Sequence, residues 1–213
     1  MSWHTLFTVD TTRKKLSALR KDQIEYAYKD EVRQASLIVK AGGLILYPSD
    51  SLWGIGCDAS NREAVETIDR VKNRPKNKSY IVLVSDDRML QKVVREVPEV
   101  VWDIIDNSSS PVSIIYEQAN PAYGHLCAEN GSIAVRLVQP GFCREFISYT
   151  GIPLISSSAN QSGKPSPLSF EDIDQDIIDK MNFIFPPESG LDMSEKASKV
   201  ISIKSNGQVA ILR

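Results

Sequence analysis

Five cationic side chains stand close together in the segment "RVKNRPKNKSYIVLVS", which begins at residue 70. They occupy every second position with no carboxylate between them, at Arg70, Lys72, Arg74, Lys76 and Lys78. A triphosphate needs several fixed positive donors, which a single helix terminus cannot supply. A solvated basic loop at the carboxyl end of a helix has the same composition, and composition alone favours that simpler interpretation. The segment therefore predicts either an exposed basic loop or a phosphate site.

A polar segment, "PLISSSANQSGKPSP" (153–167), follows directly on an apolar run. Ser156, Ser157, Ser158 and Asn160 come at the end of a predicted strand, with Gly163 and two prolines behind them. Hydroxyls, a carboxamide and exposed N–H groups at a strand end can hold phosphate oxygens and a ribose. Ordinary loops have the same residues, so this segment alone favours a structural loop.

A third segment, "GGLILYPSDSLWGIGCDA" (42–59), begins as an apolar strand and continues with small hydroxyl and acidic residues. Gly54 and Gly56 permit another part of the chain to approach the backbone closely. Trp53 is interpreted either as a core residue or as one wall of a pocket, and for an isolated tryptophan the core is more frequent.

Taken in their order along the chain, the three segments resemble the signature of the YrdC family. "KNRPKNK" is similar to its Lys-x-Arg-Pro-x-x-Lys element, "SIAVRL" (132–137) to its Val-Arg strand, and residues 153–167 contain its Ser-Ala-Asn loop. The resemblance is clearest over residues 42–167, and "SKVISI" and "AILR" resemble the closing strands. The motifs are specific together, although none is specific alone.

The resemblance implies a single YrdC-like α/β domain over residues 1–213. In that domain a twisted sheet of parallel and antiparallel strands is flanked by helices and carries a basic concave active-site cavity. It implies a cytoplasmic nucleotidyltransferase that makes threonylcarbamoyl-adenylate and pyrophosphate from L-threonine, bicarbonate and ATP. Mg²⁺ would arrive with ATP, with no metal ligand from the protein and no tightly bound organic cofactor. The product would serve threonylcarbamoyladenosine formation in tRNA through a separate complex, with at most weak contact to RNA.

Residue roles also follow from the resemblance. Lys72 and Arg74 would be the catalytic cations that hold the ATP phosphates. Substrate and ATP contacts would come from Ser49, Trp53, Lys72, Arg74, Lys78, Arg136, Ser156, Ser158, Asn160 and Ser198. The chemistry needs no Ser-His-Asp or Cys-His nucleophile, and none is evident in the sequence.

The chain departs from the family pattern at several positions. "NSSSPVSIIY" keeps only Pro111 of a Trp-Pro-Gly-Pro stretch, and Lys199 stands where threonine is common. The Thr-x-Thr and Tyr of the opening loop are Ser49, Ser51 and Trp53, which leaves selectivity for threonine open. The main alternative is a YciO-like paralogue that binds nucleotide or RNA without synthase activity. A carbamoyl-transfer relative within a larger protein is disfavoured by the length of 213 residues.

The elements that must position these residues follow from apolar periodicity. Predicted helices cover residues 31–41, ended by Gly42; a segment with a Ser60 and Glu63 capping box, stopped by Pro75; residues 89–97; residues 142–149; and residues 171–181 after an N-cap at Ser169. Predicted strands cover residues 44–47, 81–84, 112–116, 132–138 and 154–157, followed by a hairpin that turns at Asn206 and Gly207. Because hairpins interrupt the alternation of strands and helices, the sheet should be mixed.

Composition indicates the general class of protein. With 42% hydrophobic residues, 24% charged residues and a net charge of −2, the chain is typical of a globular protein without a generally basic surface. Cys57, Cys127 and Cys143 have no disulfide spacing and indicate reduced thiols. His4 and His125 lie too far apart for a zinc motif. We expect no export, since the amino-terminal segment "MSWHTLFTVD" has too few apolar residues for a signal h-region. We also expect no membrane span, since no later apolar run approaches about 18 residues.

Overall fold

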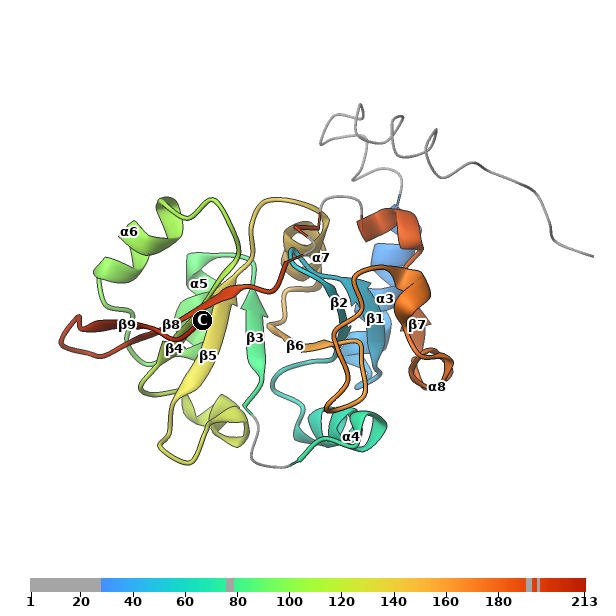
Figure 1. The fold of residues 1–213 in the computed structure, drawn as a ribbon, viewed down its shortest axis with the longest axis horizontal. Helices are drawn as coiled ribbons and strands as arrows, with labels where there is room; N and C mark the ends of the chain where they lie inside the picture. Colours follow the sequence, from blue (N-terminus) through green and yellow to red (C-terminus); the bar gives the residue numbers. More distant parts are fainter. Residues whose placement is uncertain (1–27, 76–78, 191–192, 195) are drawn as a thin grey trace, which may run out of the picture.

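The computed structural model describes residues 28–75, 79–190, 193–194 and 196–213. They form a nine-stranded sheet in the order β7-β1-β2-β6-β3-β5-β4-β8-β9 (Figure 1). The strands are β1 (Ile45–Pro48), β2 (Trp53–Gly56), β3 (Ile81–Val84), β4 (Val112–Tyr116), β5 (Ile133–Leu137), β6 (Leu154–Ser158), β7 (Phe183–Ile184), β8 (Lys199–Ile203) and β9 (Val209–Ile211). The pairs β1–β7, β3–β5 and β4–β8 are parallel and the other pairs are antiparallel, which confirms the predicted mixed sheet.

The helices pack along this sheet. They are α3 (Lys29–Lys40), α4 (Arg62–Lys72), α5 (Asp87–Val93), α6 (Val100–Asp106), α7 (Phe142–Thr150) and α8 (Gln175–Ile178), with 3-10 turns η1 (Pro121–Leu126), η2 (Phe170–Asp172) and η3 (Pro187–Gly190). α3 and α7 pack on each other and on β1, and α5 packs on β3 and β5. Figure 1 shows α3 and α7 near the β1 end of the sheet and α6 near the β4 end. No helix of the described residues is long and apolar enough to cross a bilayer.

Aromatic side chains fill the core beneath β1. Phe142 and Phe146 of α7 each contact Phe185 edge to face at 5.1 Å, and Tyr47 of β1 packs on Phe146. Gly56 is needed beside Tyr47, because a Cβ there would lie 2.6 Å from the tyrosine ring. The predicted close approach at this glycine is therefore present, and it brings β2 against the Tyr47 side chain of β1.

Local sequence signals correctly predicted one helix end and one hairpin turn. Gly42 adopts φ +83° directly after α3, as a helix-ending glycine should. Gly207 adopts φ +82° in the β8–β9 hairpin, where the Lys204 N–H donates to the Gln208 carbonyl at 3.0 Å. Both predictions are confirmed, because in each case the backbone needs the left-handed region that glycine adopts without strain.

The predicted N-cap of α4 was wrong. Its N-cap is Asn61, whose Oδ1 accepts from the Ala64 N–H at 3.1 Å, whereas the Ser60 hydroxyl donates to Asp58. The carboxamide of Asn61 reaches the third N–H of the helix from an extended backbone, so it serves as the cap. The helix ends at left-handed Asn73 (φ 48°), two residues before Pro75.

Two other predicted helices are interrupted. α5 stops at Val93 because the Asn120 amide donates to carbonyls at its end, including that of Lys92 at 2.9 Å, and α6 was not predicted. The predicted helix 171–181 is divided into η2 and α8, since Ile173 is extended. Ser169 precedes η2 with its N–H and hydroxyl both donating to Asp172. Strand β2 was also not predicted as a strand.

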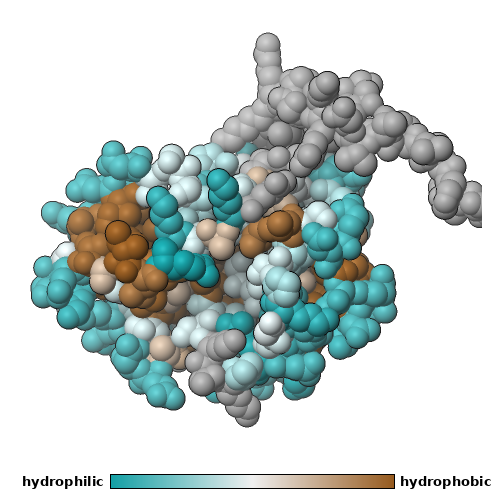
Figure 2. Space-filling model, in the orientation of Figure 1, coloured by the Kyte–Doolittle hydropathy of each residue, from teal (hydrophilic) through white to brown (hydrophobic). Residues whose placement is uncertain are grey.

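The β9 edge of the sheet is apolar and exposed. Ile211 and Leu212 are 79% and 60% exposed, and Figure 2 shows a hydrophobic patch at this end of the molecule.

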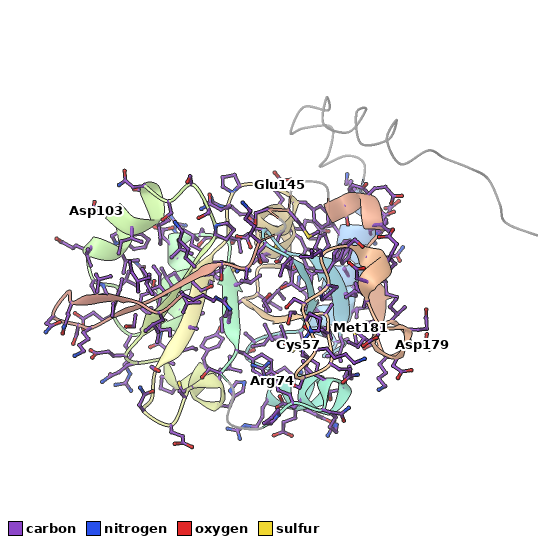
Figure 3. All side chains as sticks on the ribbon, in the orientation of Figure 1. Cys57, Arg74, Asp103, Glu145, Asp179 and Met181 are labelled. Carbon is purple, nitrogen blue, oxygen red and sulfur yellow. The ribbon has the colours of Figure 1, made fainter. Side chains whose placement is uncertain are left out.

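The three cysteines predicted to be reduced are free thiols. Cys57, labelled in Figure 3, is buried, and this burial raises its pKa.

Candidate active site

The sheet order brings the sequence motifs to one place. β6 lies between β2 and β3, so that Ser158 is opposite Gly54 and Ser156 is opposite Ile81. On the far side of β3, β5 places Arg136 opposite Leu83. The opening loop, the cationic segment, the Val-Arg strand and the Ser-Ala-Asn loop therefore meet around the middle of the sheet.

A cavity of about 270 Å³ lies at this meeting point. Of the predicted site residues it is lined by Ser49, Trp53, Arg74, Arg136, Ser156, Ser158 and Ser198. Lys72 and Asn160 lie next to lining residues without lining the cavity themselves, and Lys78 lies outside the described residues. Among its described lining residues are three arginines and no carboxylate, so the cavity suits an anion.

Lys72 is not a solvated loop cation. Its side chain is buried in the last turn of α4, only 2% exposed, and its ammonium donates a hydrogen bond to the carbonyl oxygen of Ser158. That carbonyl belongs to a residue that lines the cavity. The simpler interpretation of an exposed basic loop is therefore wrong at this position, and Lys72 places its positive charge directly beside the cavity wall.

The Ser-Ala-Asn loop is fastened to α4 by further contacts. Gln161 donates through Nε2 to the Val71 carbonyl at 3.1 Å, and the Ser162 N–H donates to the Lys72 carbonyl at 3.0 Å. The Asn160 amide donates to the carbonyl of Lys164 at 2.7 Å, which closes the loop on itself. Sequence reasoning missed Gln161, because its partner is 90 positions away along the chain.

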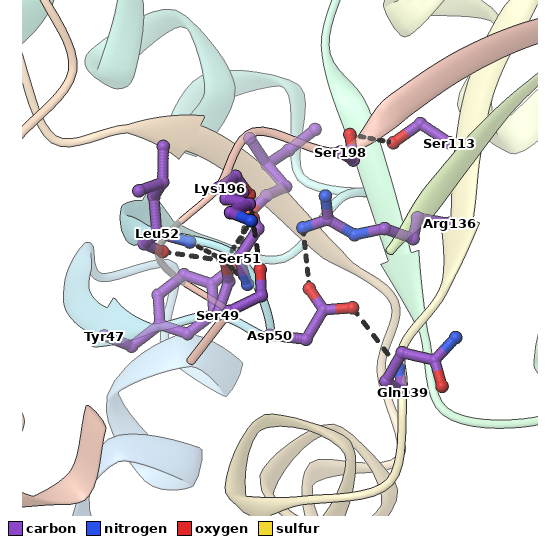
Figure 4. A network of polar contacts seen from close by, with 12 residues as sticks. Tyr47, Ser49, Asp50, Ser51, Leu52, Ser113, Arg136, Gln139, Lys196 and Ser198 are labelled. Atoms are coloured by element: carbon purple, nitrogen blue, oxygen red, sulfur yellow. Dashed lines mark hydrogen bonds and ion pairs between the residues drawn. The ribbon is translucent and has the colours of Figure 1, made fainter. Parts of the chain in front are cut away.

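The turn between β1 and β2 is organised by one hydroxyl. Ser49 Oγ accepts from the N–H groups of Ser51 and Leu52, each at 3.1 Å, and donates to the Leu52 carbonyl at 2.7 Å (Figure 4). These bonds use the hydrogen-bonding capacity of Ser49 within the turn. Ser51 also lines the cavity, and its hydroxyl is hydrogen-bonded to the Ser49 hydroxyl at 3.0 Å.

Arg136 is held by a buried carboxylate. Its Nη2 lies 3.0 Å from Oδ1 of Asp50, whose other oxygen accepts from the Gln139 N–H at 3.3 Å (Figure 4). Nearby, the hydroxyls of Ser113 and Ser198 are hydrogen-bonded at 2.8 Å. Asp50 lies behind Arg136 and outside the cavity lining, so it neutralises part of the charge and fixes the guanidinium toward the cavity.

Trp53 is both a core residue and a cavity wall. It is 2% exposed and contacts the Phe170 ring edge to face at 5.1 Å. The same side chain lines the cavity. The two interpretations offered by the sequence therefore both hold for this residue.

Buried polar atoms at the site have unused hydrogen-bonding capacity. Arg136 Nε, Ser157 Oγ and Asn160 Oδ1 are buried and have no hydrogen-bond partner within the described part of the chain. Buried polar groups are normally paired, because each unpaired group loses its hydration without compensation. Two of these residues line the cavity, which indicates a site that a polar ligand completes.

Arg74 lies beside α4 (Figure 3), on the boundary between two cavities. The second cavity, of about 840 Å³, lies between α4 and η1 and shares Arg74 and Ser79 with the first. Its lining mixes arginines with Glu66, Asp69 and Glu129, so its charge is not that of an anion site. The smaller cavity is therefore the better candidate for the chemistry.

Further lining residues were missed by sequence reasoning. They are Ser51, Leu52, Ser79, Ile81, Ser166, Ala197 and Arg213, whereas Ser157 belongs to the polar segment that the sequence had already indicated. Arg213 is the most informative, because it adds a third guanidinium and donates to the Ser198 carbonyl at 3.1 Å. The available signal was the arginine at the end of "AILR". In the described residues, no cluster of three or more His, Cys, Asp or Glu side chains could hold a metal ion.

The family model and the curated relatives that match this chain point to the same family. Residues 37–213 match the Sua5/YciO/YrdC family model, whose description reads "Telomere recombination". The curated threonylcarbamoyl-AMP synthase of Marinobacter nauticus is 30% identical over 172 residues, which cover 80% of this chain and 90% of the relative. The one from Stenotrophomonas maltophilia is 32% identical over 155 residues, covering 71% and 83%.

Solved structures share the fold. P. abyssi Sua5 complexed with L-threonine gives a TM-score of 0.74 at 23% identity over 85% of this chain. This chain spans about half of that protein, with 53% covered. E. coli YciO gives a TM-score of 0.69 at 21% identity, covering 85% of this chain and 87% of YciO.

Proposed function

Because the chain belongs to the Sua5/YciO/YrdC family, we propose that it is a threonylcarbamoyl-AMP synthase, a nucleotidyltransferase that uses L-threonine, bicarbonate and ATP. The amine of threonine takes up carbon dioxide as a carbamate, and a carbamate oxygen attacks the α-phosphorus of ATP. As the new oxygen–phosphorus bond forms, the bond from the α-phosphorus to its bridging oxygen breaks, and pyrophosphate leaves. Such a reaction requires mainly the positioning and neutralisation of anions.

The observation that carries the proposal is the composition of the 270 Å³ cavity. Arg74, Arg136 and Arg213 line it together with several serines, and no carboxylate is among its described lining. Buried Arg136 Nε has no protein partner within the described residues. Fixed guanidinium groups in a partly dehydrated cavity stabilise phosphate charge more strongly than mobile surface cations do. The site therefore fits a bound polyphosphate or carboxylate.

We assign roles from this geometry. Arg74 contacts the phosphates, and Lys72 adds its charge through the cavity wall while holding the Ser158 carbonyl. Ser156 and Ser158 offer hydroxyls to the nucleotide, and Arg136 receives a carboxylate or phosphate oxygen. Ser51 and Trp53 bound the amino-acid end, with Ser49 shaping the turn between them. Asn160 keeps the Ser-Ala-Asn loop closed beside the cavity through its amide.

Mg²⁺ enters as part of the MgATP substrate in this proposal. The described lining of hydroxyls and guanidinium groups fits phosphate oxygens that already hold a metal, since Mg²⁺ itself prefers carboxylate and water ligands. The product would be passed to a separate tRNA-modifying complex in the cytoplasm. Direct contact with RNA would be weak, because the chain carries a net charge of −2.

The YciO-like alternative has less support. YciO shares the fold, but its 21% identity carries no functional argument. The curated relatives at 30% and 32% identity are both named threonylcarbamoyl-AMP synthase. Tight, salt-resistant binding of RNA without adenylate formation would favour the alternative.

The experiment is pyrophosphate release from MgATP, with threonine and bicarbonate supplied together or omitted one at a time. Release should need both, and Arg74→Ala should lower it. Arg70→Ala is a matched control, because the Arg70 guanidinium donates to Thr67 Oγ1 at 2.7 Å on α4 and does not line the 270 Å³ cavity. ATP turnover that is indifferent to threonine would overturn the proposal.

A further inference from the structure

Arg74 is surrounded by residues that fix its guanidinium, and two of them lie outside the 270 Å³ cavity. We propose that Asp69 and Tyr80 are positioning residues that hold Arg74 in place at the cavity wall before ATP arrives. The inference rests on the proposed function for the identity of the ligand. It deepens that function by assigning roles to two residues that the sequence motifs leave out.

The first restraint acts on the backbone. The Arg74 N–H donates to the Asp69 carbonyl at 2.9 Å, directly after the left-handed residue Asn73. This 6→1 bond is the pattern of a Schellman helix end, which fixes the direction in which the chain leaves the helix. The Cα of Arg74 is therefore tied to the last turn of α4.

The second restraint acts on the side chain. The Arg74 guanidinium carbon lies 4.3 Å from the centre of the Tyr80 ring, and Nη2 donates to the Ser79 carbonyl at 2.7 Å. Asp69 Oδ1 lies 3.9 Å from Arg74 Nε and accepts from the Tyr80 hydroxyl at 2.5 Å. The ring, the carboxylate and the guanidinium thus form one closed set of contacts.

Burial makes these contacts effective. Tyr80 is 5% exposed, and the side chains of Arg74 and Asp69 are 14% and 27% exposed. A cation over an aromatic face is attracted more strongly when water is excluded. Burial and the Asp69 carboxylate raise the pKa of Tyr80, so its hydroxyl remains a donor to Asp69.

A held guanidinium differs in function from a mobile one. Arginine has many rotamers, and ordering them on binding lowers affinity, whereas a pre-ordered side chain avoids that loss. Arg70 provides the contrast, since its guanidinium donates to Thr67 Oγ1 on the exposed surface of α4. The pair of Asp69 and Tyr80 therefore distinguishes Arg74 from the neighbouring cation.

The test is a double-mutant cycle on MgATP affinity, measured by titration calorimetry on the full chain. Tyr80→Leu removes the ring and the hydroxyl and should weaken MgATP binding about 3- to 10-fold. Tyr80→Phe, which keeps the ring, should lose less, and Asp69→Asn should also weaken binding. In an Arg74→Ala background, Tyr80→Leu should change affinity less than about 2-fold, because its effect passes through Arg74.

Tyr116→Leu is the control for loss of a buried tyrosine. Tyr116 is 2% exposed in β4 and does not line the 270 Å³ cavity, so its replacement should leave MgATP affinity unchanged in the folded protein. If Tyr80→Leu fails to fold, Tyr80→Phe and Asp69→Asn complete the cycle with Arg74→Ala. The inference would be overturned if Tyr80→Leu lowered MgATP affinity equally with and without Arg74, or if it caused no loss of affinity when Arg74 is present.

The outcomes also separate this inference from the proposed function. A protein that binds MgATP with the expected coupling but makes no adenylate would overturn the synthase proposal and support the positioning roles. A wild-type protein that does not bind MgATP would overturn both.

Discussion

The carboxylate of Asp50 and the guanidinium of Arg136 form an ion pair of 3.0 Å, with side chains only 6% and 3% exposed. The pair joins the β1–β2 turn to β5, and Arg136 carries its charge to the cavity (Figure 4). A buried pair of this kind contributes little net stability, but loss of one partner leaves the other charge uncompensated.

Arg136→Met should therefore lower the free energy of unfolding by about 3–5 kcal/mol, because Asp50 is left buried and unpaired. Asp50→Asn combined with Arg136→Met should be less destabilised than the sum of the two single changes. Urea denaturation of the four proteins measures the coupling. Strict additivity would contradict the ion pair.

Lys72→Ala should lower both turnover and stability. Its ammonium donates to the Ser158 carbonyl from a side chain that is 2% exposed, and loss of a buried charged donor costs about 1–3 kcal/mol. Turnover should fall about tens to hundreds of fold if the charge also acts on phosphate. Lys76→Ala, at a position that the motif leaves free, should be nearly silent. Comparable damage from both replacements would indicate an effect of summed charge.

Serine should be a poorer substrate than threonine. A pocket that buries the threonine methyl group loses about 1–3 kcal/mol of transition-state binding without it. The ratio of kcat/KM for the two amino acids measures this difference directly. Equal values would mean that the wall formed by Ser51 and Trp53 does not contact the methyl group.

Stability should fall as the pH drops below about 6.5, in part through His125. Burial lowers the pKa of His125, with a further contribution from Arg62, so the folded protein binds this proton less readily than the unfolded chain does. The unfolded state therefore gains protons first on acidification, and the contribution of neutral His125 is lost below the unfolded pKa. Denaturation of His125→Gln from pH 7.5 to 5.0 should show a shallower decline. An unchanged slope would place the proton uptake at other groups.

Local sequence determined the features that depend on near neighbours. Gly42 and Gly207 end a helix and turn a hairpin because each needs a backbone conformation that glycine adopts easily. The apolar runs at residues 81–84 and 112–116 became buried strands of a mixed sheet. The motifs also identified the family and about half of the described residues that line the cavity, because those residues lie within the recognisable segments.

Only the tertiary structure decided how those residues are used. Lys72 is buried against Ser158, which is 86 positions away, and Asp50 faces Arg136 across the site. Arg213 joins the cavity because β9 pairs with β8. Spacing along the chain carries no information on which distant carbonyl or carboxylate approaches a cation. That approach depends on strand order and register, which are determined by burial of the apolar faces of the whole sheet.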